Sequence, residues 1–172
     1  MRPYLAEAVA SVCGDDVELC AVCVAKGMEF LSAPYETIQK VTEDLVRSDG
    51  ERYCFSKSQE EVDTLLWEAQ LKYVFPLVEN YRRYFVKKYY DFIKAALPIN
   101  NGYGDQVMVP EEAELGNLMY LVERGGIPVS AEESMELKRY RKARNELAHM
   151  NLLSNEELCV ILKAGKHKTA SD

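Results

Sequence analysis

Residues 130–149 read Ser-Ala-Glu-Glu-Ser-Met-Glu-Leu-Lys-Arg-Tyr-Arg-Lys-Ala-Arg-Asn-Glu-Leu-Ala-His. This stretch predicts a helix over residues 131–150 that opens with a capping box, in which Ser130 is the N-cap and Glu133 returns to its backbone. Its apolar side chains recur every three to four residues, as they do on the buried face of an amphipathic helix. A helix packed against other helices is therefore the starting point for the whole fold.

Two more capping boxes organise the rest of the second part of the chain, namely Ser58 with Glu61 and Ser154 with Glu157. The first opens a long helix expected to reach about Leu97, and the second opens a short last helix. Pro110 suits the first turn of a further helix that should end at Gly125. Residues 58–165 therefore predict a bundle of four or five helices, and the fold class is all-α.

Proline and aromatic residues add detail to the long helix. Pro76 predicts a kink or a break near Phe75, because its ring removes one amide donor and crowds the preceding turn. Aromatic residues continue at helical spacing beyond it, at Tyr81, Tyr84, Phe85, Tyr89 and Phe92. Such a stripe can stack on bases, but we favour packing in the core or between helices. Asparagine and glycine residues then predict a loop over residues 98–104.

Residues 1–57 form a separate front segment. Its pattern predicts helices over about 3–12, 16–31 and 35–47, and a short strand at 51–55. Short helices followed by a strand are also the outline of a degenerate winged helix. The third of these helices, over about 35–47, would be the recognition helix of such a domain. It is acidic, however, and would place carboxylates next to the phosphates of a nucleic acid. We therefore interpret the segment as a packing or linker unit, and residues 166–172 as a disordered polar tail.

Composition places this 172-residue chain among globular proteins with a sizeable core, since 48% of its residues are hydrophobic. No apolar run approaches the roughly 18 residues of a membrane-spanning helix, so we expect a cytoplasmic protein with no membrane contact. An odd number of cysteines, five, indicates a reducing compartment. Cys20 and Cys23 form a C-x-x-C pair, which zinc or redox sites use, but we favour packing as small apolar residues.

Charge is distributed unevenly around a net value of −7. Residues 1–68 carry 6 basic and 14 acidic side chains, whereas residues 69–149 carry 12 basic and 11 acidic ones. From the two basic clusters of the second range we predict RNA-binding side chains at Lys138, Arg141, Lys142, Arg82 and Arg83. The alternative is that each cluster is simply a solvated helix face.

Arg144, Asn145 and His149 are the candidate catalytic residues. An imidazole with an ordinary pKa near 6.5 can take the proton from an RNA 2′-hydroxyl, and a guanidinium can hold the phosphate oxygens. This chemistry yields a 2′,3′-cyclic phosphate and needs no metal, and we expect no cofactor. Arg144 and His149 would lie about 140° apart around one helix, which favours a site that two subunits complete together. Alternatively, His149 is only a cation near a helix C-terminus.

The sequence from Arg144 to His149 resembles the R-N-x-x-x-H motif of the HEPN superfamily (higher eukaryotes and prokaryotes nucleotide-binding). The similarity extends to the basic helix before the motif, to residues 150–154 after it, and to the runs 66–70 and 75–79. It covers roughly residues 58–165. The toxin branch of the superfamily has a tyrosine two residues after the histidine, where this chain has Asn151, so regulation through a modified tyrosine is not expected.

The resemblance implies an all-helical, homodimeric, metal-independent endoribonuclease that cleaves single-stranded RNA in a toxin–antitoxin, phage-defence or RNA-processing system. It also implies an antitoxin or an ATPase as a partner, since some members are appendages of ATPases. Other members are inactive. The alternative is therefore a non-catalytic module for dimerisation, RNA binding or partner docking, and nucleotide binding in the bundle is a third, weaker hypothesis.

Overall fold

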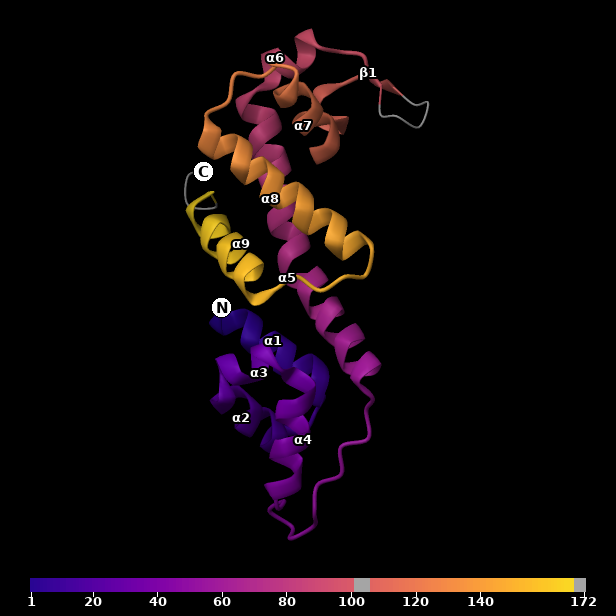
Figure 1. The fold of residues 1–172 in the computed structure, drawn as a ribbon, viewed down its shortest axis with the longest axis vertical. Helices are drawn as coiled ribbons and strands as arrows, with labels where there is room; N and C mark the ends of the chain where they lie inside the picture. Colours follow the sequence, from indigo (N-terminus) through magenta and orange to yellow (C-terminus); the bar gives the residue numbers. More distant parts are fainter. Residues whose placement is uncertain (101–105, 169–172) are drawn as a thin grey trace. The chain divides into compact units, whose positions relative to one another are not determined.

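The computed structural model describes residues 1–100 and 106–168 (Figure 1). Helix accounts for 72% of these residues, and the only strands among them are the two-residue pair β1 (Ile99–Asn100) and β2 (Gln106–Val107). The expected all-α class is therefore confirmed. Within the same described ranges, no helix is both long enough and apolar enough to cross a membrane.

The chain groups into two compact units. One unit combines Met1–Tyr73 with Leu147–Cys159, and the other combines Val74–Glu146 with Val160–Asp172. Three helices pass from one unit into the other: α5 (Gln59–Lys88), α8 (Ala131–Ala148) and α9 (Asn155–Lys168). The domain boundary expected at residue 57 stays a prediction, and an irregular segment over residues 53–58 leads into α5.

The front helices of the first unit are α1 (Arg2–Cys13), α2 (Val17–Lys26), α3 (Met28–Ser32) and α4 (Pro34–Asp44), which gather into one cluster (Figure 1). The single helix expected over residues 16–31 is wrong, because Gly27 separates α2 from α3. Gly27 has φ +56, and its amide bonds back to Val24. The strand expected at residues 51–55 is reduced to one isolated bridge between Val46 and Arg52, so no wing of a winged helix is formed by these described residues.

The second unit contains most of α8, the second half of α5 and the short helices α6 (Tyr90–Ala95), η1 (Pro110–Glu112) and α7 (Leu115–Glu123). Of the kink or break expected at Pro76, the break is absent, because α5 runs through the proline as one helix, and the kink stays a prediction. Buried Val74 and Val78 flank the proline, so packing on both sides offsets the lost hydrogen bond. The helix ends at Lys88 rather than near Leu97, and α6 follows.

The aromatic stripe of α5 belongs to the core of the second unit. Tyr81, Phe85 and Tyr89 are buried, and the Tyr81 ring stacks on Tyr140 of α8 at 4.0 Å between centroids and 8° between planes. The packing interpretation is confirmed for these three rings. Part of the loop expected over residues 98–104 and the last four residues of the expected tail lie outside the described residues, while α9 continues to Lys168.

Candidate functional site

Helix α8 begins with the predicted capping box. The Ser130 amide donates to Glu133 Oε2 at 3.1 Å, and the Glu133 amide donates to Ser130 Oγ at 3.2 Å. Glu133 also pairs with the Lys88 ammonium and accepts from the Tyr89 hydroxyl at 2.9 Å. These donors, the Lys88 ammonium first, lower the pKa of Glu133 to about 2. The start of the helix is therefore fixed by a charged cluster.

The two faces of α8 differ in burial and in charge. Its buried stripe consists of Leu137, Tyr140, Ala143 and Leu147. The side chains of Lys138, Arg139, Arg141, Lys142 and Arg144 are exposed, and we call this set the basic face. The helix thus offers solvent a row of cations while its apolar side packs inward.

The C-terminal end of α8 is held by the only tryptophan of the chain. Trp67 Nε1 on α5 donates to the backbone oxygen of Leu147 at 2.9 Å. That oxygen, in the last turn, also accepts from the Met150 amide at 3.2 Å. Carbonyl groups at a helix end lack partners within the helix, so the indole N–H stabilises the point at which α8 stops.

Residues 149–152, the exit loop, follow α8 and lead to Leu153. Gln70 of α5 is buried and forms two hydrogen bonds with the Leu153 backbone: its Nε2 donates to the carbonyl oxygen at 3.1 Å, and its Oε1 accepts from the amide at 2.7 Å. Within the loop, Met150 adopts φ +59. The exit loop is therefore anchored at both ends by α5, through Trp67 and Gln70.

The three predicted catalytic residues lie around this helix end. Arg144 is exposed and Asn145 is half-buried, and both lie in the last turns of α8. His149 is exposed and is the first residue after the helix, which ends at Ala148 and not at about residue 150. His149 thus lies at the junction between α8 and the exit loop, directly before Met150, whose φ is +59.

The second predicted basic cluster is partly engaged within the protein. The Arg82 guanidinium donates to both Glu79 oxygens and to the backbone oxygens of Glu111 and Ala113 at 2.7–3.1 Å. Only 15% of its side chain is exposed, and its hydrogen bonds to the Glu79 carboxylate lower the pKa of Glu79 to about 2. Arg82 therefore joins α5 to the segment around η1. Arg83 also bonds to Glu79, but its side chain remains 72% exposed.

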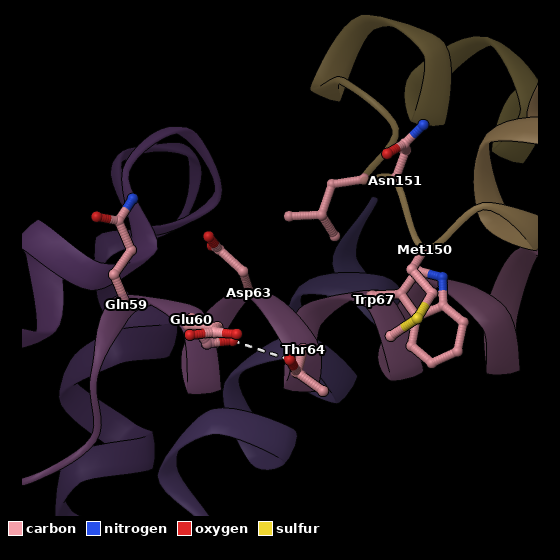
Figure 2. A pocket seen from close by; sticks show the side chains of 8 residues that line it. Gln59, Glu60, Asp63, Thr64, Trp67, Met150 and Asn151 are labelled. Atoms are coloured by element: carbon pink, nitrogen blue, oxygen red, sulfur yellow. Dashed lines mark hydrogen bonds between the residues drawn. The ribbon is translucent and has the colours of Figure 1, made fainter.

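A groove of about 740 Å³ lies beside the exit loop, within the first unit (Figure 2). It is lined by Gln59, Glu60, Asp63, Thr64, Trp67, Met150, Asn151 and Leu152. Figure 2 shows the lining side chains of α5 together with the exit-loop residues Met150 and Asn151. Sequence reasoning did not assign this groove, although Glu60, Asp63, Thr64 and Trp67 have the spacing of one helix face.

Three of the four cysteines of the front segment, Cys13, Cys20 and Cys23, lie on α1 and α2, whereas Cys54 is exposed in the irregular segment. Cys13 and Cys23 are buried and their thiols hydrogen-bond, an interaction that lowers the pKa of Cys23. Cys20 donates to the Gly14 carbonyl at 3.6 Å. Among the residues that the structure describes, no group of three or more His, Cys, Asp or Glu side chains could hold a metal ion. Cys13 and Cys23 thus contribute to the core, like small apolar residues.

Comparisons with protein-family models, curated proteins and solved structures found no match to this chain. The resemblance to HEPN domains therefore stays a prediction that rests on residues 144–149 and their sequence context. Function has to be inferred from the residues of the chain itself.

Proposed function

We propose that the protein is a metal-independent endoribonuclease of the HEPN type that acts as a homodimer. The observation that carries the proposal is the exposure of His149 immediately after the basic face of α8, on a loop that α5 anchors at both ends. Phosphodiester cleavage of this kind requires an accessible imidazole to move a proton and a cation to oppose the charge on the phosphate. RNA is the substrate because its 2′-hydroxyl supplies the nucleophile.

Each side chain has a defined role in this reaction. The His149 imidazole accepts the proton of the 2′-hydroxyl as the 2′-oxygen attacks phosphorus. The bond from phosphorus to the 5′-oxygen breaks, and the same imidazole, now protonated, gives its proton to the leaving oxygen. Arg144 opposes the negative charge that grows on the phosphate, and Asn145 orients the phosphate or the imidazole. The products are a 2′,3′-cyclic phosphate and a 5′-hydroxyl.

The basic face extends the contact along the RNA backbone. Lys138, Arg141 and Lys142 are exposed on the same helix as Arg144 and can each neutralise a phosphate. Arg83 is the exposed member of the α5 cluster, whereas Arg82 is engaged with Glu79 and two backbone carbonyls. Binding to RNA should therefore weaken with rising salt, mainly through the residues of α8.

The deciding experiment gives purified protein a single-stranded RNA in the presence of EDTA. We expect cleavage that persists in EDTA, leaves 2′,3′-cyclic phosphate ends and disappears in His149→Ala. The matched control is His167→Ala, because His167 is the only other histidine of the chain. Equal activity in the wild type and in His149→Ala would identify a contaminating nuclease and end the proposal.

The biological setting that fits this activity is cytoplasmic: a toxin, a phage-defence nuclease or an RNA-processing enzyme, with an antitoxin or an ATPase as a partner. The HEPN resemblance alone supports this setting. A cleavage assay with a purified inhibitor or ATPase encoded beside this chain would test it.

A second candidate function is a non-catalytic module for dimerisation or partner docking. It is favoured by large exposed apolar side chains of the second unit, among them Phe75, Tyr84 and Phe92. Arg144 and His149 serve catalysis in the first function and the stability of the fold in the second. Because both are exposed, their alanine variants should change the free energy of unfolding by only about 0.5 kcal/mol. Losses above about 2 kcal/mol without any RNA cleavage would favour the docking module.

A further inference from the structure

The groove beside the exit loop has an unusual composition for a ribonuclease surface. Its charged lining residues are Glu60 and Asp63, and no lysine, arginine or histidine lines it among the residues that the structure describes. A phosphate would meet only carboxylates there. The groove therefore suits a neutral or donor-rich part of a ligand rather than the RNA backbone, which the basic face of α8 can bind.

Trp67 forms a fixed aromatic wall of this groove. Its indole N–H is already bonded to the Leu147 oxygen, so the ring cannot rotate freely and offers a ligand only its carbon surface. Met150 and Leu152 add exposed apolar side chains, 63% and 39% exposed, from the exit loop. A planar ring can stack on such a surface, and base–aromatic stacking contributes about 1–3 kcal/mol per base.

The polar side chains stand on the same face of α5 as the tryptophan. Asp63 lies one helical turn before Trp67, and Glu60 lies about one turn before Asp63, so a ring on the indole can reach a carboxylate with its polar edge. The Thr64 hydroxyl is bonded to the Glu60 backbone oxygen at 2.9 Å (dashed line in Figure 2). The charged groups of the groove, Glu60 and Asp63, are acceptors, and Gln59 and Asn151 add one side-chain amide each. Its ligand should be rich in donors.

We propose that this groove is a nucleobase subsite that takes a guanine of the RNA beside His149. The inference rests on the proposed function and adds a base preference to it. Guanine presents its N1–H and its 2-amino group side by side, which matches the two oxygens of one carboxylate. Adenine and cytosine have an amino group with no ring N–H beside it, and uracil has a ring N–H with no amino group, so each offers a carboxylate one donor instead of two. The groove volume lies in the range of about 300–1,000 Å³ typical of small-ligand sites.

The sole tryptophan makes this proposal directly measurable. DNA lacks the 2′-hydroxyl and cannot be cleaved by the proposed reaction, so binding and catalysis separate. The probes are a thymidine pentanucleotide and the same strand with one central guanine, adenine or inosine; inosine lacks the 2-amino group. All four carry identical phosphates. We expect the guanine strand to quench Trp67 fluorescence and to bind at least tenfold more tightly than the thymidine and inosine strands.

Substitutions in the groove then locate the preference. Asp63→Asn and Glu60→Gln should together reduce the guanine advantage to less than twofold. The matched control is Glu68→Gln, an exposed carboxylate on α5 that does not line the groove, and it should leave the advantage unchanged. Circular dichroism of each variant confirms that the helices remain. Equal binding of all four strands, or quenching by spermidine and not by guanine, would overturn the proposal.

The two proposals fail separately. Tighter binding of the guanine strand without RNA cleavage would support the guanine subsite and contradict the proposed nuclease activity. Cleavage that depends on His149, with no guanine advantage and no effect of Asp63→Asn, would keep the nuclease and remove the subsite.

Discussion

Gln70 is the buried residue that fixes where the exit loop ends. Its amide satisfies both the N–H and the C=O of Leu153, and its side chain also hydrogen-bonds with the Tyr4 hydroxyl. Only 3% of Gln70 is exposed, and a buried amide needs hydrogen-bond partners. These bonds supply them. A polar side chain in this position specifies the backbone path from α8 to α9.

We expect Gln70→Ala to lower the free energy of unfolding by about 2–4 kcal/mol, because it leaves buried backbone groups of Leu153 without partners. Urea unfolding followed by Trp67 fluorescence measures this. The control is Gln39→Ala, an exposed glutamine on α4, which should cost no more than about 0.5 kcal/mol. Equal losses of stability in the two variants would show that the hydrogen bonds between Gln70 and the Leu153 backbone do not stabilise the protein.

At the scale of elements, the sequence patterns locate helix starts better than helix interruptions. All three predicted capping boxes are present, at Ser58, Ser130 and Ser154. A capping box is local, so its residues are sufficient to predict it. The break at Pro76 and the uninterrupted helix through Gly27 were wrong, because tertiary packing decides whether a helix continues through a proline or stops at a glycine.

The site shows the same division between local and non-local information. The basic face of α8 could be predicted, since it follows from the spacing of residues along one helix. The anchoring of the exit loop could not, because Trp67 and Gln70 lie 80 and 83 residues before their partners. The groove was missed for the same reason: its walls come from distant parts of the sequence.

Alanine substitutions at two glycines should change the stability of the protein in opposite directions, because the glycines differ in backbone conformation. Gly27→Ala should destabilise the protein by about 1–2 kcal/mol, because an L side chain at φ +56 is strained. Gly116→Ala, in the first turns of α7, should stabilise it by about 0.5–1 kcal/mol, since a methyl group there meets nothing within 4 Å. Chemical denaturation measures both. A stabilising Gly27→Ala would show that α2 and α3 can merge into one helix.

At the scale of the whole molecule, the proposed active site depends on a second copy of the chain. If each site takes Arg144 from one subunit and His149 from the other, two inactive variants should complement each other. Mixing equal amounts of Arg144→Ala and His149→Ala lets half of the dimers become mixed dimers, each with one intact site out of two. We expect about a quarter of the wild-type cleavage rate.

The mixture is prepared by unfolding and refolding the two variants together, and each variant refolded alone is the control. A rate no higher than that of either variant alone would show that both residues of a site come from one chain. The proposed chemistry would survive that outcome, but the composite site would not.

Within the first unit, the front helices are attached to α5 and to the start of α9 by side-chain contacts as well as by the chain. Asn155 Nδ2 donates to the Leu31 oxygen at 2.9 Å, Lys72 pairs with Glu7, and the Tyr4 ring meets Tyr73 edge-on. A protease cut in the irregular segment 53–58 would spare all three contacts, and the two fragments would stay together. Deleting the same helices would instead bare the apolar surfaces that they cover and invite aggregation.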